Sequence, residues 1–229
     1  MELPVLYEDE HYIAINKPNA LLVHRTNISE DTVFALQLLR KQVGYRIYPV
    51  HRLDRATSGV LIFGKTSEAA GQLSEQMRQQ AIQKYYVAII RGFVHEEATI
   101  DYPLKHLERG IVQEARTSYQ RLAQVEHPFA ISRYPTSRYS LVRIQLHSGR
   151  RHQIRRHFAH LRHPIIGDSR YGDIKHNKYF REILGIPHLL LHARQFSFTH
   201  PFSGQTLMIE APFLESFAKA KQVLELVLS

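Results

Sequence analysis

The sequence predicts an α+β fold with a mixed, largely antiparallel central sheet and flanking helices. Some segments alternate apolar and polar residues in the manner of strands, and others repeat apolar residues at helical spacing. The two kinds of segment do not alternate strictly along the chain. Strict alternation is typical of a doubly wound parallel sheet, so the irregular order favours the α+β class.

Eight segments are expected to form strands. Residues 84–91 are apolar on both faces, which indicates a central strand, and residues 139–146 should bury Val142 and Ile144 while exposing Arg143. In chain order, the expected strands are residues 5–7, 12–15, 60–63, 84–91, 115–126, 139–146, 189–198 and 207–211. The first two and the last two should each form a hairpin across a turn.

The first of four expected helices follows Asp31 or Thr32, either of which could cap its first turn. Val33, Leu36 and Arg40 should fall on one stripe of this helix, and Phe34 and Leu38 on an adjoining one. Gly44 should end the helix because glycine accepts a left-handed backbone conformation. The other helices are expected over residues 67–80, 152–162 and 214–228.

Two of these helices have specific signals. Thr66 or Ser67 should cap the helix over residues 67–80, since their hydroxyl groups can accept backbone N–H groups. In the helix over residues 152–162, Ile154, Phe158 and Leu161 follow i, i+4, i+7 spacing. That spacing predicts one apolar stripe facing the core.

The composition indicates a polyanionic partner. The 30 lysine and arginine residues against 21 aspartate and glutamate residues give a formal charge of +9, which favours nucleic acid first and a membrane surface second. No apolar run approaches the roughly 20 residues that span a bilayer, and the N-terminus lacks a signal-peptide pattern, so a cytoplasmic location is expected. The absence of cysteine excludes disulfides, thiolate zinc sites and cysteine nucleophiles.

Residues 51–59 (HRLDRATSG) place one carboxylate between two guanidinium groups. The charges of Arg52 and Arg55 favour the ionised form of Asp54, which suits a nucleophile or base rather than a proton donor. Such clusters are more often surface ion pairs. Here residues 57–59 should form a sharp turn into the apolar strand that follows. A polar side chain at the end of a buried strand is well placed for chemistry.

The stretch 51–63 (HRLDRATSGVLIF) resembles the signature of the RluA family of pseudouridine synthases. Other motifs of that family resemble, in the same order, residues 16–24, 84–88, 148–168 and 190–201. Ala20 stands where the first motif usually has glycine. The arginine-rich stretch 149–163 most resembles the family member that isomerises uridine 65 of tRNA. The resemblance implies the catalytic-domain fold of these synthases, as a single domain over residues 1–229 without a separate N-terminal RNA-binding domain.

The resemblance also implies roles for individual residues. Asp54 matches the catalytic aspartate of an isomerase that detaches uracil from C1′ of a uridine and rejoins it through C5, without a metal or other cofactor. Arg155 matches the residue that pairs with this aspartate, Tyr86 the tyrosine that packs against the target base, and Leu191 the apolar residue that lines the uracil pocket. From the residues alone, Arg155 could face solvent or bind phosphate, and Tyr86 and Leu191 could be core residues.

A stacked, paired uridine must be extruded before it can react, which costs on the order of a few kcal/mol. Contacts with RNA should offset this cost, and Arg52 and Arg55 are expected beside the substrate. The expected contacts to the RNA backbone are Arg133, Arg138, Arg150, Arg151, Arg156 and Arg162, with Lys175 and Lys178. Two expected loops, residues 127–138 and 169–183, are predicted to grip the RNA. Binding should therefore weaken steeply with salt.

Several alternatives remain open or are disfavoured. His157, His160 and His163 are spaced like zinc ligands, but Pro164 ends the helix after the third, so no metal is expected. A glycoside hydrolase would need two carboxylates flanking a bond, and the motif has one. The expected partner is tRNA, with ribosomal RNA as the alternative and a non-catalytic RNA-binding protein on the same scaffold as a further one. No membrane and no obligate protein partner are implied.

Overall fold

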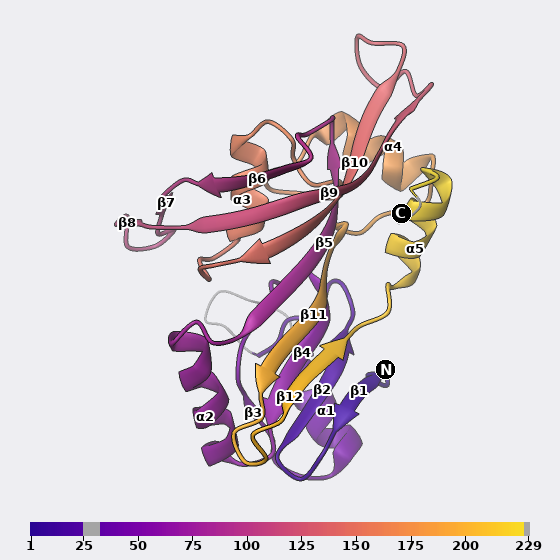
Figure 1. Cartoon of the computed structure of the whole chain (residues 1–229). Helices are drawn as coiled ribbons and strands as arrows, with labels where there is room; N and C mark the ends of the chain where they lie inside the picture. The colour runs from indigo at the N-terminus through magenta and orange to yellow at the C-terminus, as the bar shows by residue number, and fades with distance from the viewer. Residues whose placement is uncertain (25–32, 227–229) are drawn as a thin grey trace. The chain divides into compact units, whose positions relative to one another are not determined.

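The computed structural model describes residues 1–24 and 33–226, which form two compact units (Figure 1). The first unit comprises residues 1–84 and 193–212, and the second comprises residues 85–192 and the segment from Phe213 onward. Each unit has its own core of buried apolar side chains. The expected α+β class, with largely antiparallel strands and flanking helices, is confirmed. That all 229 residues act as one catalytic domain stays a prediction.

The sheet of the first unit has the neighbour order β1-β2-β4-β11, with β12 paired to β11 and β3 paired to β4. These strands are β1 (Val5–Glu8), β2 (Tyr12–Lys17), β3 (Tyr48–Pro49), β4 (Ser58–Gly64), β11 (Leu191–Thr199), which belongs to this unit from Ala193, and β12 (Thr206–Glu210). The β1–β2 and β11–β12 hairpins are confirmed, and Pro18 follows the end of β2. Every residue of β2 and β4 is buried, so the middle of this sheet is core.

Helix α1 (Ala35–Val43) begins later than the sequence predicted. Phe34 is still extended and forms a bridge with Leu22, so the helix can start only at Ala35. The buried residues of the helix are consequently Ala35 and Leu39, which neither predicted stripe contained; of the predicted stripe residues, Phe34 is buried but precedes the helix. Asp31 and Thr32, the expected caps, lie outside the described residues. Gly44 ends the helix with φ of +79°, as predicted.

Helix α2 (Ser67–Arg78) follows the sequence pattern closely. The Thr66 side chain accepts a hydrogen bond from the Ala69 N–H, which confirms the expected cap. Ala69, Ala70 and Leu73 are buried. Two of them, Ala69 and Leu73, share a core with apolar residues of β2 and β4. This packing holds α2 against the first sheet.

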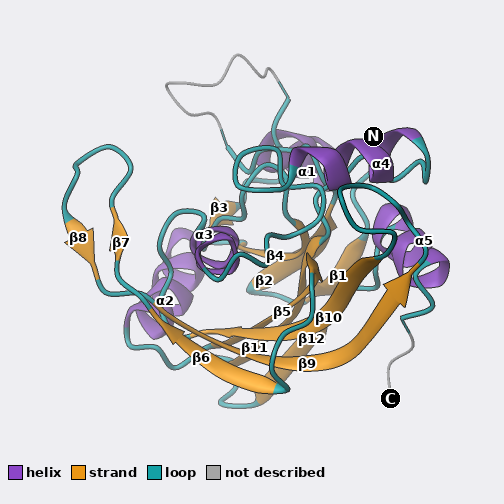
Figure 2. Cartoon of the chain, turned by 90° about the horizontal axis from the view of Figure 1, so that it is seen from above, coloured by secondary structure: helices purple, strands orange, loops and turns teal. Residues whose placement is uncertain are grey.

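The second unit has the strand order β5-β10-β9-β6 (Figure 2). Its strands are β5 (Gln83–Arg91), which belongs to this unit from Tyr85, β6 (Glu97–Asp101), β9 (Arg116–His127) and β10 (Ser137–Leu146), with a separate hairpin of β7 (Leu104–Lys105) and β8 (Val112–Gln113). In β10, Val142 and Ile144 are buried and Arg143 is exposed, as predicted. Strands β3, β6, β7 and β8 were not predicted. Of these, β3, β7 and β8 have only two residues each.

The helices of the second unit are α3 (Gln153–His160), α4 (Ile174–Glu182) and α5 (Glu215–Val223). Helices α3 and α5 are shorter than predicted. The expectation that residues 169–183 form a loop is wrong, because Asp173 caps α4 by accepting the N–H groups of Lys175 and His176. The other expected loop is shorter than 127–138, since β9 extends to His127 and β10 starts at Ser137. None of the described helices is long and apolar enough to cross a membrane.

Candidate active site

Asp54 lies on a turn between β3 and β4. The Thr57 N–H donates to the Asp54 carbonyl oxygen at 3.1 Å, so the chain reverses over residues 54–57. The predicted turn at residues 57–59 is therefore three positions too late, since Ser58 and Gly59 already belong to β4. Gly59 has φ of +110°, and an added Cβ would lie 2.2 Å from the carbonyl oxygen of Ala193. Only glycine permits this approach of β4 to β11.

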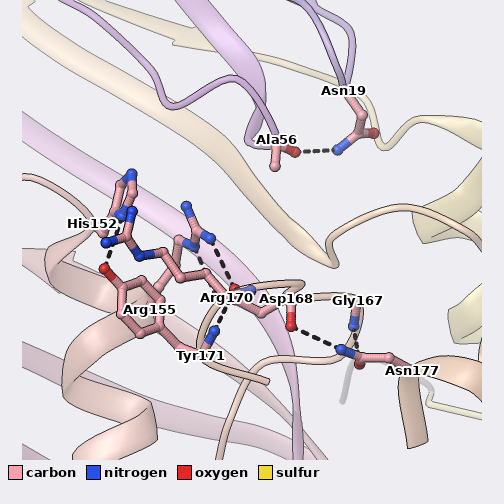
Figure 3. A network of polar contacts seen from close by, with 9 residues as sticks. All are labelled: Asn19, Ala56, His152, Arg155, Gly167, Asp168, Arg170, Tyr171 and Asn177. Carbon is pink, nitrogen blue, oxygen red and sulfur yellow. Dashed lines mark hydrogen bonds and ion pairs between the residues drawn. The ribbon is translucent and has the colours of Figure 1, made fainter. Parts of the chain in front are cut away.

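The motif around Lys17 holds the Asp54 turn in place. Lys17 is fully buried, and its Nζ donates to the carbonyl oxygens of Pro18 and Leu21 at 2.8 Å and of Arg55 at 3.3 Å. The Asn19 Nδ2 donates to the carbonyl oxygen of Ala56 at 2.6 Å (Figure 3). Burial lowers the pKa of Lys17 to about 7, while the Asp54 carboxylate opposes this effect. Hydrogen bonds thus connect the sequence motif at residues 16–24 with the motif at residues 51–59.

His51 anchors the segment that precedes Asp54. Its ring stacks on Phe196, with centroids 5.0 Å apart, and its Nε2 accepts the N–H of Ile62 in β4 at 3.1 Å. An accepting Nε2 requires the neutral ring. Burial, with a smaller effect of the Lys84 charge, lowers the pKa of His51 to about 3. The side chains of Arg52 and Arg55, by contrast, are exposed.

The other predicted substrate residues belong to the second unit. Tyr86 lies in β5 opposite Ile144 of β10 and is 8% exposed, and Leu191, the first residue of β11, is 3% exposed. Arg155 lies in α3 and is also buried. Asp54, Arg52 and Arg55 share one turn of the first unit. Of the residues predicted to bind the substrate, Tyr86, Leu191 and Arg155 thus belong to the second unit, and Arg52 and Arg55 belong to the first.

Arg155 forms a two-pronged ion pair with Asp168 (Figure 3). Its Nε and Nη2 donate to the two carboxylate oxygens at 2.8 Å each, and both side chains are buried. Asp168 also accepts the N–H groups of Arg170 and Tyr171. Burial opposes ionisation of Asp168, but the hydrogen bonds and charge of Arg155 outweigh it and lower its pKa. The paired geometry fixes the plane of the guanidinium group.

Further contacts fix the helix that carries Arg155. The Gln153 side chain accepts from Ser148 Oγ at 2.8 Å and donates to Thr117 Oγ1 at 2.9 Å. His157 Nδ1 lies 2.9 Å from the same Thr117 oxygen, and its Nε2 lies 3.0 Å from the carbonyl oxygen of Tyr102. Gln153, Thr117 and His157 are buried and Ser148 is partly buried, whereas Tyr102 is exposed. Helix α3 therefore has a defined rotation as well as a defined position.

The segment that carries Asp168 is held by α4. Asn177 accepts the Gly167 N–H and donates to the Asp168 carbonyl oxygen, both at 2.8 Å (Figure 3). Asp168 and Asn177 were not predicted from the sequence as partners of the site. The available signal was the cap residue Asp173 followed by His176 and Phe180 at helical spacing, which together predict α4.

The six arginines predicted to contact the RNA backbone are all in the second unit. Arg133, Arg138, Arg150, Arg151 and Arg162 are exposed, and Arg156 is half-buried. The three histidines considered as metal ligands have other partners: His157 as above, His160 stacks on Tyr102, and His163 Nδ1 lies 2.9 Å from the Arg91 carbonyl oxygen. Within residues 1–24 and 33–226, no group of three or more histidine, aspartate or glutamate residues is placed to hold a metal.

The fold and these motifs define the class of protein as a pseudouridine synthase. The chain belongs to the RNA pseudouridylate synthase family, whose model matches residues 11–160, and the resemblance seen in the sequence is confirmed. It is 48% identical to a tRNA pseudouridine synthase C from Haemophilus ducreyi, covering 92% of this chain and 91% of that protein. It is 46% identical to the protein of the same name from Vibrio vulnificus, covering 91% and 90%.

Solved structures give the same class of fold. The structure of human RNA pseudouridylate synthase domain containing 4 matches with a TM-score of 0.76 and 23% identity, covering 97% of this chain and 93% of that one. The human domain-containing 1 protein matches with a TM-score of 0.73 and 21% identity, covering 99% and 96%. At these identities the likeness concerns the fold alone.

Proposed function

We propose that this chain isomerises a uridine of tRNA to pseudouridine, with Asp54 as the catalytic residue. The observation that carries the proposal is the Asp54 turn itself. A family signature sequence places the carboxylate there, and buried Lys17, Asn19 and the glycine at position 59 fix the backbone around it. A reacting group held by fixed neighbours needs little reorganisation during the reaction.

The reaction breaks the bond between C1′ and N1 of the uridine, turns the detached base and forms a bond between C1′ and C5. The proton on C5 is then lost and N1 regains one, so no atom leaves and no redox change occurs. The protein must supply a carboxylate near the ribose and an enclosure for the free uracil. We assign the first task to Asp54 and the second to Tyr86 and Leu191, whose burial in the second unit supports this role.

Arg155 is proposed to pair with Asp54 when the substrate is bound. Its buried pairing with Asp168 supports a positioning function, because it orients the guanidinium group before the reaction starts. Arg52 and Arg55 are proposed to contact the extruded nucleotide, which their exposure permits. The six arginines predicted from the sequence are proposed to bind the RNA backbone elsewhere.

The proposal that tRNA is the substrate is supported by the names of the most similar curated relatives, at 43–48% identity over most of the chain. An enzyme that acts on tRNA would work in the cytoplasm. Position 65 is the specific expectation. The alternative is a ribosomal RNA substrate for the same chemistry.

The test is to incubate the purified chain with total tRNA and, separately, with ribosomal RNA fragments, and to map pseudouridine in both. We expect new pseudouridine at one tRNA position, uridine 65. New pseudouridine only in ribosomal RNA would establish the alternative substrate. No pseudouridine in either RNA, from a folded chain that binds both, would support the non-catalytic RNA-binding protein instead.

A further inference from the structure

A cavity of about 610 Å³ lies in the second unit, apart from the residues assigned to the reaction. It is formed by the β9–β10 loop, seen at the top of Figure 1, together with the end of β5 and the first turn of α4. Ser132 to Arg138 supply one wall, and Arg91, Gly92 and His176 supply the other. Its volume falls within the roughly 300–1,000 Å³ of ligand-binding sites.

The lining of this cavity is positively charged. Arg91, Arg133 and Arg138 line it, and none of its lining residues, all within the described part of the chain, is acidic. Arg91 pairs with Asp173, and Arg138 Nε pairs with Glu126 at 3.0 Å. A guanidinium group has five N–H donors, so one carboxylate does not use all of them. The cavity can therefore donate hydrogen bonds to an anion.

An aromatic side chain at the rim adds a stacking surface. Tyr134 is 58% exposed. The Arg133 guanidinium lies 4.9 Å from the centre of its ring and donates to its hydroxyl group at 2.7 Å. Exposed aromatic rings and arginine planes are the surfaces on which unpaired nucleobases stack.

The walls of the cavity are held in place before any ligand binds. Ser137 Oγ donates to the Phe129 carbonyl oxygen at 2.7 Å, and the Phe129 ring packs against Tyr179 of α4 with centroids 5.2 Å apart. On the other side, Ser140 Oγ donates to the Gly92 carbonyl oxygen at 2.8 Å. Preformed walls reduce the entropy lost on binding.

We infer that this cavity binds a backbone phosphate and an adjacent unstacked base of the RNA substrate, at a position other than the reacting uridine. This inference rests on the proposed function. Along β5, Arg91 is five residues beyond Tyr86, which is about 17 Å at 3.3 Å per residue. If Tyr86 holds the target base, the cavity reads RNA several nucleotides away. It would then determine which RNA is accepted rather than how the uridine reacts.

The test compares full-length tRNA with a short stem that contains only the target uridine and its paired neighbours. We expect Arg133→Ala and Tyr134→Ala each to raise the Kd for tRNA about tenfold. Neither should change the Kd for the short stem, which lacks the RNA proposed to reach the cavity. Arg133→Ala should also reduce the salt slope of tRNA binding by about one. Tyr134→Phe, which keeps the ring, should restore tRNA binding.

Arg78→Ala is the charge-matched control, because Arg78 is an exposed arginine on α2 of the first unit. An unchanged Kd for tRNA in Arg133→Ala and Tyr134→Ala would overturn the inference, and so would equal losses for tRNA, the short stem and the Arg78 control. Failure of the proposed function is a separate result, since it appears as absence of pseudouridine with the wild-type chain, whatever the Kd values of the variants are.

Discussion

Ala20 has a left-handed backbone conformation, with φ of +61°, at the position where related motifs usually have glycine. A residue with a Cβ atom destabilises the folded state by about 1–2 kcal/mol in this conformation. Glycine avoids this cost, but it also gives the unfolded chain more conformational freedom, which offsets part of the gain in stability. Ala20→Gly should therefore raise the free energy of unfolding by up to about 1 kcal/mol, measured by urea denaturation.

The matched control for Ala20 is Gly44→Ala, which introduces the same strain at φ of +79° with no atom within 4 Å of the new Cβ. It should lower the free energy of unfolding by about 1 kcal/mol. A lower stability of Ala20→Gly would show that the alanine methyl group makes a packing contribution larger than its strain.

His51 makes the stability of the protein depend on pH. Burial lowers its pKa to about 3 from an ordinary value of 6.5. Below pH 6.5 the unfolded chain takes up a proton that the folded chain does not, so stability falls as the pH falls from 6.5 towards 3. At pH 5 this residue should account for a loss of about 2 kcal/mol.

His51→Gln removes the titrating group while keeping an oxygen that can accept the Ile62 N–H. Its loss of unfolding free energy between pH 7 and pH 5 should be smaller than that of the wild type by about 2 kcal/mol. The control is His95→Gln, which replaces an exposed histidine and is measured over the same pH range. Parallel pH profiles for wild type and His51→Gln would contradict this role of His51.

At the scale of elements, α3 and α4 act together to present Arg155. Asp168 lies on the segment between these helices, and its two oxygens hold the Arg155 guanidinium group. Asp168→Ala would leave a buried arginine without this partner, which should lower the free energy of unfolding by about 3–5 kcal/mol. The measurement is urea denaturation, with Glu75→Ala as the control for loss of an exposed ion pair, where we expect no measurable change.

An Asp168→Asn variant separates stability from positioning. Asparagine keeps the shape of the side chain but accepts only one of the two hydrogen bonds from Arg155. We expect a folded protein with a lower single-turnover rate and an unchanged Kd for RNA. An unchanged rate would show that Asp168 stabilises the fold without orienting Arg155 for the reaction.

Sequence periodicity predicted those elements whose pattern follows from local burial. The cap at Thr66, the alternation in β10 and the end of α1 at Gly44 are all local signals, and all are confirmed. Helix α4 was missed because one of its two core-facing residues is His176, which a count of apolar residues omits. The start of α1 was misplaced because the bridge between Phe34 and Leu22 is a tertiary contact that periodicity does not report.

In the candidate site, too, residues that are neighbours in the sequence could be predicted, whereas contacts between residues distant in the sequence could not. The Asp54 motif is contiguous in the sequence, so its residues could be identified there. The residues that hold this motif in place are distant in the sequence. Lys17 is 38 residues before its partner Arg55, and Asn19 is 37 residues before its partner Ala56. Only the folded chain shows that these motifs share hydrogen bonds.

At the scale of the whole molecule, Asp54 belongs to the first compact unit, and Tyr86, Arg155 and Leu191 belong to the second. The formal charge of +9 suits a polyanionic substrate that contacts many basic residues. The six arginines predicted to contact the RNA backbone and the cavity beside Arg133 belong to the second unit. We therefore expect RNA affinity to depend mainly on the second unit, whereas the reacting carboxylate belongs to the first.

The most direct measurement is the single-turnover formation of pseudouridine in tRNA by Asp54→Asn, alongside its Kd for the same tRNA. Asparagine keeps the size of the side chain and removes its negative charge, so we predict binding within about twofold of the wild type and at least a 10³-fold loss of rate, as expected when a catalytic group is removed. Pseudouridine formation at the wild-type rate by Asp54→Asn would contradict the assignment of Asp54 as the catalytic residue.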